Sequence, residues 1–345
     1  MDASIASILA VDGVVNGAVY ALVAIALVLV FTVTRVVFIP QGEFVAFGAL
    51  TMAMLQAGTI PGTVWLLLLI AASVAILDVL EARRDHWPAQ RLGRRLLRSL
   101  GFPLVAVTAG IVLAPMKLAM PLQLLLSLAL VVPMGPLVYR LAYRSLADRS
   151  VLVLLIVSVG VHFALTGLGL LFFGAEGFRN PTFWDTRLEM GPVTLSGQAL
   201  IILLVSVLLI IALFLFFDRT LSGKALRATS VNRTGARLMG ISTDSAGSLS
   251  FTLAAAIGAL SGLLIGPTTT VFYDSGFLIG LKGFVAAVFA GLTSFPLSLV
   301  GALGVGLIES FGSFWASAFK EVIVFTAILP VLLWRSFVDP HDEEH

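Results

Sequence analysis

Long apolar stretches alternate with short polar connections along most of the chain. The stretches fall at about 9–34, 42–57, 61–80, 102–116, 118–139, 151–173, 199–217, 248–272, 279–293, 297–318 and 321–337. Most approach the roughly 20 residues that a helix needs to cross the hydrocarbon core of a bilayer. The ten-residue alternating segments of a membrane β-barrel do not occur. The pattern predicts an all-α, polytopic transmembrane helix bundle with about 8–11 membrane segments, some short or re-entrant.

Clusters of basic residues between the apolar stretches predict the orientation of the bundle. Three connections hold 14 of the 21 Lys and Arg residues. Positively charged loops stay on the cytoplasmic side, so we expect all three to be cytoplasmic and the loop 174–198 to face outward. The basic residues are Arg83, Arg84, Arg91, Arg94, Arg95 and Arg98 in the first connection, Arg140, Arg144 and Arg149 in the second, and Arg219, Lys224, Arg227, Arg233 and Arg237 in the third.

Two of the apolar stretches, 42–57 and 279–293, are short and bounded by Gly, Ser or Pro. Sixteen helical residues cover only about 24 Å, less than the roughly 30 Å of the hydrocarbon core. The two stretches also resemble each other, since Gly-Glu-Phe-Val-Ala at 42–46 parallels Lys-Gly-Phe-Val-Ala at 282–286. Paired interrupted segments indicate a transport pathway at a repeat interface. The alternative is two tilted short helices with a chance similarity.

Composition agrees with a membrane protein and excludes other classes. The chain has 345 residues, 59% of them hydrophobic and 12% charged, whereas a soluble protein is about one quarter charged. A soluble enzyme, a disordered chain and a fibrous protein are therefore excluded. The absence of Cys excludes disulfides and thiolate chemistry. The first apolar run is too long for the core of a signal peptide, so we interpret it as an uncleaved helix of a single transmembrane domain over 1–345.

The sequence contains no recognisable catalytic or metal-binding motif. It lacks a phosphate-binding loop, His-Glu-x-x-His and Gly-x-Ser-x-Gly, and of the four His residues only His162 lies in an apolar stretch. We therefore expect no catalytic residue, no metal and no cofactor in this chain. Eight ionisable residues near membrane depth are too dispersed to predict a proton relay, and five of them should reach the interface. They are Glu43, Lys282 and Glu309, together with the five expected at the interface, Asp12, Asp78, Lys117, Lys320 and Glu321.

The connection 218–247 is basic and long enough for a short surface helix over 224–239. Small residues keep such a helix slim, so it could dock into a groove on a partner. The alternative is a positive loop that contacts lipid head groups. Within it, residues 232–241 read Asn-Arg-Thr-Gly-Ala-Arg-Leu-Met-Gly-Ile.

This segment resembles the coupling-helix pattern Asn-Arg-Glu-Ala-Ala-x-x-x-Gly-Ile of branched-chain amino acid ABC importer permeases of the LivH type. Thr234 stands at the acidic position and Gly235 at the first Ala. Four other stretches are similar to the same family in the same order. They are Asn-Gly-Ala-Val-Tyr-Ala-Leu at 16–22, Gln-Gly-Glu-Phe at 41–44, the Tyr-Arg-containing stretch 139–146, and 280–296 around Lys282. The similarity covers roughly 10–60 and 135–337. Residues 79–117 look like an insertion, with a basic cytoplasmic loop at 81–101.

The resemblance implies a multi-pass permease subunit of the bacterial inner membrane, without its own ATPase. Its expected partners are separate ABC ATPase subunits that hydrolyse ATP, a second LivM-like permease, a periplasmic solute-binding protein and the lipid bilayer, but no nucleic acid. The substrate would be a branched-chain or other hydrophobic amino acid, or a related small amide. The alternative from another class is an ion-coupled secondary transporter of small organic solutes.

The same resemblance suggests two sets of functional residues. The ATPase-coupling set lies in the loop 218–247. Its members are Asn232, Arg233, Thr234, Gly235, Ala236, Arg237 and Gly240, with Arg233 and Arg237 as the expected polar contacts. The second set is expected to line or gate the translocation pathway. Its members are Asn16, Gln41, Gly42, Glu43 and Lys282.

Overall fold

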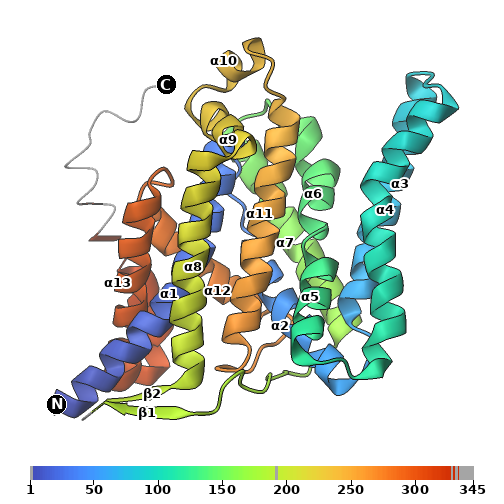
Figure 1. The fold of residues 1–345 in the computed structure, drawn as a ribbon. Coiled ribbons are helices and arrows are strands. Elements are labelled where there is room, and N and C mark those ends of the chain that lie inside the picture. The colour runs from blue at the N-terminus through green and yellow to red at the C-terminus, as the bar shows by residue number, and fades with distance from the viewer. Residues whose placement is uncertain (1–2, 191–192, 328, 331–332, 334–345) are drawn as a thin grey trace.

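The computed structural model describes residues 3–190, 193–327, 329–330 and 333. Within this part the chain is almost entirely helical (Figure 1). The helices are α1 (Ala3–Thr34), α2 (Gln41–Ala57), α3 (Gly62–Arg84), α4 (Ala89–Leu113), α5 (Met120–Val131), α6 (Met134–Val138), α7 (Val151–Phe173), α8 (Gly197–Arg219), α9 (Leu221–Val231), α10 (Arg233–Leu238), α11 (Thr243–Ile265), α12 (Ser275–Phe289), α13 (Phe295–Ala316) and α14 (Lys320–Thr326). Strands β1 (Arg187–Met190) and β2 (Val193–Ser196) form an antiparallel hairpin.

The described residues include eight helical segments that are long and apolar enough to cross a membrane. These are Ser4–Thr34, Gly62–Arg84, Ala89–Met116, Met120–Leu146, Val151–Phe173, Gly197–Arg219, Thr243–Ile265 and Phe295–Thr326. Helices α2 and α12, with 17 and 15 residues, are shorter, as the sequence predicted for the two interrupted stretches. The all-α polytopic fold class is confirmed.

The three basic connections lie at one end of the bundle. Figure 1 shows the tip of the α3–α4 hairpin, the end of α6 and helices α9–α10 at the same, upper end. The start of α1 and the β1–β2 hairpin lie at the opposite end (Figure 1). By the positive-inside rule the upper end is the one expected on the cytoplasmic side. The backbone bridge between Phe178 and Val271 joins the outward loop to the connection between α11 and α12.

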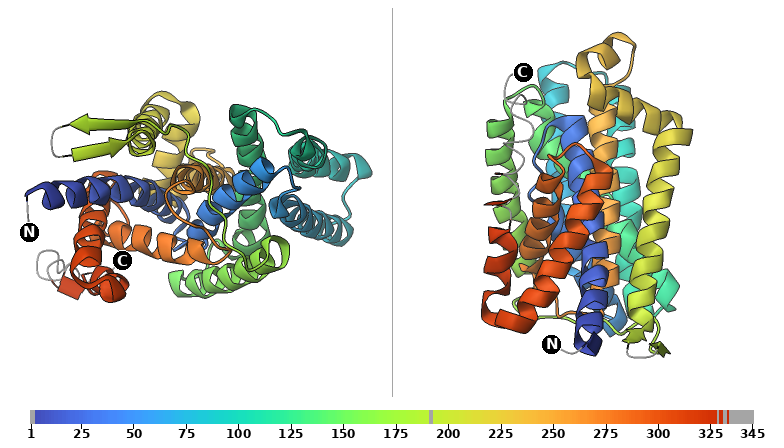
Figure 2. Two further views of the ribbon diagram at one scale, coloured as in Figure 1. Left: turned by 90° about the horizontal axis from the view of Figure 1, so that it is seen from below. Right: turned by 90° about the vertical axis from the view of Figure 1, so that its left-hand side faces the viewer.

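Small residues allow the central helices to pack with their backbones close together. Gly306 of α13 faces Gly13 and Gly17 of α1, where an added Cβ atom would overlap the α1 backbone. Gly42 of α2 crosses α12 at Gly276 in the same way. Such contacts replace the hydrophobic driving force, which is absent between helices in lipid. Helices α1, α2, α11, α12 and α13 form this core, whereas α4, α7 and α8 lie at the periphery and expose apolar side chains (Figure 2).

The structure corrects the prediction of a basic loop over 81–101, because most of this segment is helical. Only residues 85–88 connect α3 to α4. The segment 89–101 is rich in Arg and Leu, which favour helix, and Arg95 pairs with Glu81 on the facing helix at 2.8 Å. The polar hairpin tip is therefore a helical extension of two membrane spans.

The chain reverses between α13 and α14. Lys282 contacts the carboxylates of both Glu309 and Glu321. In one continuous helix those two residues would be about 18 Å apart. The short 3₁₀ turn Ser317–Phe319 instead returns α14 alongside α13. This confirms a break between the predicted stretches 297–318 and 321–337. Most of the residues from 327 to 337 lie outside the described part of the chain.

The Gly306 contact predicts a difference between two glycines of the same helix. Gly306→Leu should destabilise the detergent-solubilised protein by about 1–3 kcal/mol or more, because the side chain has no room against α1. Gly304→Leu is the matched control, since nothing lies within 4 Å of its added Cβ atom. Thermal unfolding followed by size-exclusion chromatography measures both. Equal stability of the two variants would contradict the backbone contact between α1 and α13.

Candidate coupling and translocation sites

The predicted coupling segment is two short helices rather than the single helix expected over 224–239. Asn232 separates α9 from α10, because its backbone is extended (φ −149°, ψ 100°). Its side-chain Oδ1 accepts a hydrogen bond from the Gly235 amide at 2.8 Å and so caps α10. The sequence signal for this break was Asn232 itself, since Asn is among the preferred N-cap residues.

The two arginines of the coupling set bond within the chain. Arg233 donates through Nη1 to the carbonyl of Ala147 at 2.8 Å. Arg237 donates through Nε to the Thr243 hydroxyl at 2.9 Å, and its Nη2 lies 3.3 Å from a carboxylate oxygen of Asp148. These contacts fasten α10 to the connection before α7 and to the start of α11. The expected contact of both arginines with an ATPase stays a prediction.

The remaining members of the coupling set differ in exposure. Thr234 is exposed, whereas Ala236 is buried beneath the turn. Gly240 ends α10 with a positive φ of 81°, a conformation that favours glycine. Within residues 232–240, Asn232 caps α10, Ala236 is buried, and Gly240 has a left-handed backbone conformation.

Sequence reasoning missed the apolar tip of the segment. Val231, Leu238 and Met239 are 81%, 84% and 82% exposed. On the opposite side, Leu226 is buried with Leu29 and other residues of α1 and α11. The segment thus presents apolar side chains outward while its base is fixed to the bundle.

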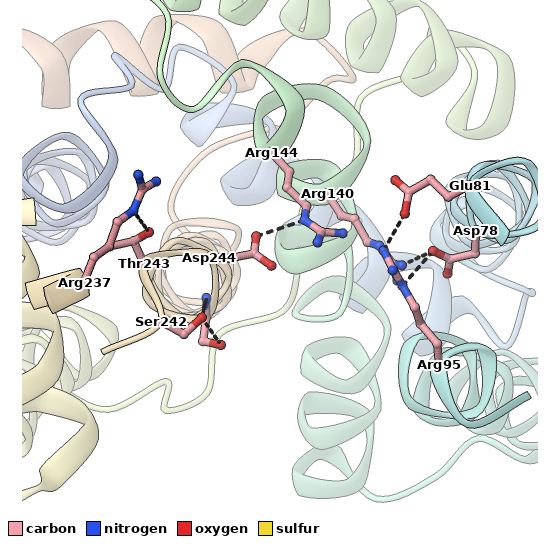
Figure 3. A network of polar contacts seen from close by, with 10 residues as sticks. Asp78, Glu81, Arg95, Arg140, Arg144, Arg237, Ser242, Thr243 and Asp244 are labelled. Atoms are coloured by element: carbon pink, nitrogen blue, oxygen red, sulfur yellow. Dashed lines mark hydrogen bonds and ion pairs between the residues drawn. The ribbon is translucent and has the colours of Figure 1, made fainter. Parts of the chain in front are cut away.

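A second polar network lies at the same end of the bundle (Figure 3). Arg144 pairs with Asp244 at 3.1 Å, which joins the helical turns that follow α6 to the start of α11. Asp78 of α3 accepts from Arg140 and lies 3.1 Å from Nε of Arg95. Asp78 was expected to reach the interface, which stays a prediction; its side chain is buried between the two guanidinium groups.

Lys282 lies at the centre of a buried charge cluster. Its Nζ is 2.5 Å from Glu309 and 3.1 Å from Glu321, and Tyr20 donates to the other oxygen of Glu309 at 2.5 Å. The cluster joins α1, α12, α13 and α14. The sequence placed Glu309 near membrane depth, but its partner Tyr20 is 289 residues away along the chain and could not be predicted. Glu321 was expected to reach the interface, which stays a prediction; the structure shows it half-buried against Lys282.

Glu43 and His162 form a second buried polar contact. Their Oε1 and Nδ1 atoms are 2.6 Å apart, between α2 and α7, and the ring of Phe277 from α12 packs 4.7 Å from the imidazole centroid. The other carboxylate oxygen of Glu43 is buried without a hydrogen-bond partner among the described residues. The fold therefore brings several of the ionisable groups that looked dispersed in the sequence, among them Glu43, Lys282 and Glu309, into contact with polar partners.

The other pathway residues occupy the same core. Gln41 donates through Nε2 to the Ala254 carbonyl of α11 at 2.9 Å. Gly42 lies at the crossing of α2 and α12, one residue from Glu43. Asn16 is half-buried on α1, and no side-chain hydrogen bond of Asn16 occurs with the described residues. The structure brings Gln41, Gly42 and Glu43 together but places Lys282 in the separate cluster around Glu309.

Comparison with known proteins identifies the family. Residues 100–333 match the family described as "Branched-chain amino acid transport system / permease component". The chain belongs to this permease family. This confirms the resemblance found in the sequence, and the matched range contains the coupling segment and Lys282. The basic tip of the α3–α4 hairpin before residue 100 lies outside the matched range.

Three curated relatives share similar sequence identity with this permease, between 27% and 30%. The "High-affinity branched-chain amino acid transport system permease protein BraD" of Pseudomonas aeruginosa is 30% identical over 243 residues, which cover 67% of this chain and 79% of BraD. The corresponding LivH of Escherichia coli K12 is 30% identical over 201 residues, or 56% of this chain and 65% of LivH. A "Probable branched-chain amino acid transport permease protein LivH" of Methanocaldococcus jannaschii is 27% identical over 204 residues. No solved structure matches the chain.

The Lys282 cluster predicts a non-additive pair of substitutions. Lys282→Met should destabilise the permease by about 3–5 kcal/mol, because it leaves the buried Glu309 without its cation. Lys282→Met/Glu309→Met should recover at least half of that loss, since an apolar pair replaces a buried ion pair at little cost. Thermal unfolding in detergent gives the coupling energy of the double-mutant cycle. Losses that simply add would show that the two residues do not interact.

Proposed function

We propose that this chain is the membrane-spanning subunit of an ATP-driven ABC importer. The observation that carries the proposal is the α9–α10 segment, which presents an apolar tip at the basic end and is anchored at its base. An exposed apolar patch of this kind marks a protein interaction site. The chain has no phosphate-binding loop, so the energy would come from ATPase subunits that bind there and hydrolyse ATP, with no cofactor in this chain.

The packing supplies a route for movement from this segment to the core. Leu226 connects α9 with α1 and α11, and Arg237 bonds to Thr243 at the start of α11. Helices α1 and α11 in turn pack on α2, α12 and α13. Closure of the ATPase subunits on ATP would therefore push α9–α10 and rock these helices between inward-open and outward-open arrangements.

The substrate and the other partners follow from the family. The names of the relatives support a branched-chain or other hydrophobic amino acid, or a related small amide, as the transported molecule. A second, LivM-like permease would complete the pathway, and a periplasmic binding protein would deliver the substrate to the end that carries β1–β2. We place the assembly in the bacterial inner membrane. Asn16, Gln41, Gly42, Glu43 and Lys282 are the polar positions proposed for gating.

Association with the ATPase tests the coupling surface. The permease is co-expressed with the ATPase subunits of its source, and their co-purification in detergent is measured. Val231→Asp/Met239→Asp should abolish co-purification, because both side chains project from the segment and contact little of the permease. Leu221→Asp, at the other end of α9 and 87% exposed, is the matched control and should retain the ATPase. Retention by the double variant would place the coupling surface elsewhere.

An ion-coupled secondary transporter remains the second candidate because of the Glu43–His162 contact. A protonatable pair at membrane depth is a feature of proton-driven carriers. Uptake of radiolabelled leucine is measured in proteoliposomes that contain the permease, with and without its partners and ATP. We expect uptake only with ATP, ATPase subunits and binding protein. Uptake driven by a pH gradient in the permease alone, and lost in Glu43→Gln, would reverse the assignment.

A further inference from the structure

A groove at the cytoplasmic end separates α4 from α5, α6 and α11. Its cavity volume is about 410 Å³. Phe102, Val132 and Leu137 contribute apolar walls, and Arg98 and Arg140 lie at its basic end. Along α4, the basic group comes before the apolar one: Arg98 lies nearer the cytoplasmic start of the helix, and Phe102 lies one turn deeper. The groove thus changes from basic to apolar towards the membrane interior.

The basic end of the groove has more arginines than neighbouring carboxylates to pair with them. Arg95 and Arg140 pair with Asp78, and Arg95 also pairs with Glu81. Arg91, Arg94 and Arg98 have no carboxylate partner among the described residues. Together with Arg95 they surround a second hollow of about 490 Å³.

The position of these arginines on α4 increases the positive potential. Arg91 lies in the first turn of the helix, where the helix dipole is already positive and a further cation is unfavourable, and Arg94 and Arg98 follow within the next two turns. An anion bound there would be stabilised by both. The guanidinium of Arg91 also lies 4.8 Å from the ring centroid of Trp87, and tryptophan is enriched at the level of lipid head groups.

We propose that this groove, together with the hollow that shares Arg95 and Arg98 with it, binds an anionic phospholipid of the cytoplasmic leaflet. Arg91, Arg94 and Arg98 bind the head-group phosphate, and an acyl chain lies against Phe102, Val132 and Leu137. A basic pocket between membrane helices on the cytoplasmic side is the arrangement that recognises such head groups. The apolar wall favours a lipid over a free phosphate, because a small soluble anion would leave it uncovered. Helix α4 lies at the edge of the bundle, where lipid has access (Figure 2).

The test measures lipid binding to the purified full-length permease. The protein in detergent is titrated with dioleoyl phosphatidylglycerol or dioleoyl phosphatidylcholine, and bound lipid is counted by native mass spectrometry. Arg91→Gln/Arg94→Gln/Arg98→Gln should weaken phosphatidylglycerol binding about tenfold or more, because each basic residue near a membrane surface contributes measurably to such binding. Arg95 and Arg140 are left unchanged, so the contacts that hold the α3–α4 hairpin remain.

The matched control removes three arginines from the same side of the membrane. Arg83→Gln/Arg84→Gln/Arg149→Gln has the same change in net charge, lies outside the groove and should bind phosphatidylglycerol as the wild type does. If both triple variants lost phosphatidylglycerol binding equally, the effect would come from general surface charge, and the proposed site would be overturned. Wild-type binding by the first variant would also overturn it. Displacement of the lipid by an equal concentration of glycerol 3-phosphate would show that the site recognises a free anion instead.

Discussion

The cost of burying charge in a membrane determines how the helices of this permease are joined. An isolated charge in the hydrocarbon region is expensive, so each buried ionisable group needs a partner from another helix. Lys282 joins α12 to α13 and α14, and Glu43 meets His162 between α2 and α7. Asp78 of α3 holds Arg140 in the helical turn that follows α6. Each contact specifies a helix pair, whereas apolar side chains alone would pack with many neighbours.

Close backbone contacts provide the second set of constraints. Ion pairs of this kind hold only if the helices that carry them approach closely, and the glycines allow that approach. Gly42 sets the distance between α2 and α12, so that Phe277 of α12 can cover the imidazole paired with Glu43. Gly306 does the same for α13 and α1, which carry Glu309 and Tyr20. Small residues and buried charges therefore act together.

Sequence periodicity was sufficient for the fold class, and the five motif stretches that resemble the family were sufficient for the family, whereas the orientation from the arginines stays a prediction. All three depend on local properties, such as apolar length and the position of arginines, that are read directly from the chain. The partners of Glu309 could not be predicted, because Tyr20 is 289 residues away. The break at Asn232 and the helical tip of the α3–α4 hairpin were missed for another reason. At the hairpin tip, a basic polar stretch suits a loop and a helix equally well, and the contact of Arg95 with Glu81 favours the helix. At Asn232, the N-cap preference of the residue was overlooked within an otherwise helical pattern.

The distribution of these contacts limits how the bundle can move. The Lys282 cluster and the glycine contacts fix α1, α12, α13 and α14 to one another, and breaking the cluster during transport would expose a buried charge at high cost. A push on α9 reaches this unit through Leu226 and α1. The unit would therefore rock as one body, and an aliphatic substrate would pass along its surface rather than through its charged interior. Gating by Glu43 or Lys282 would then come from the shift of the whole unit against its neighbours, with their buried contacts kept intact.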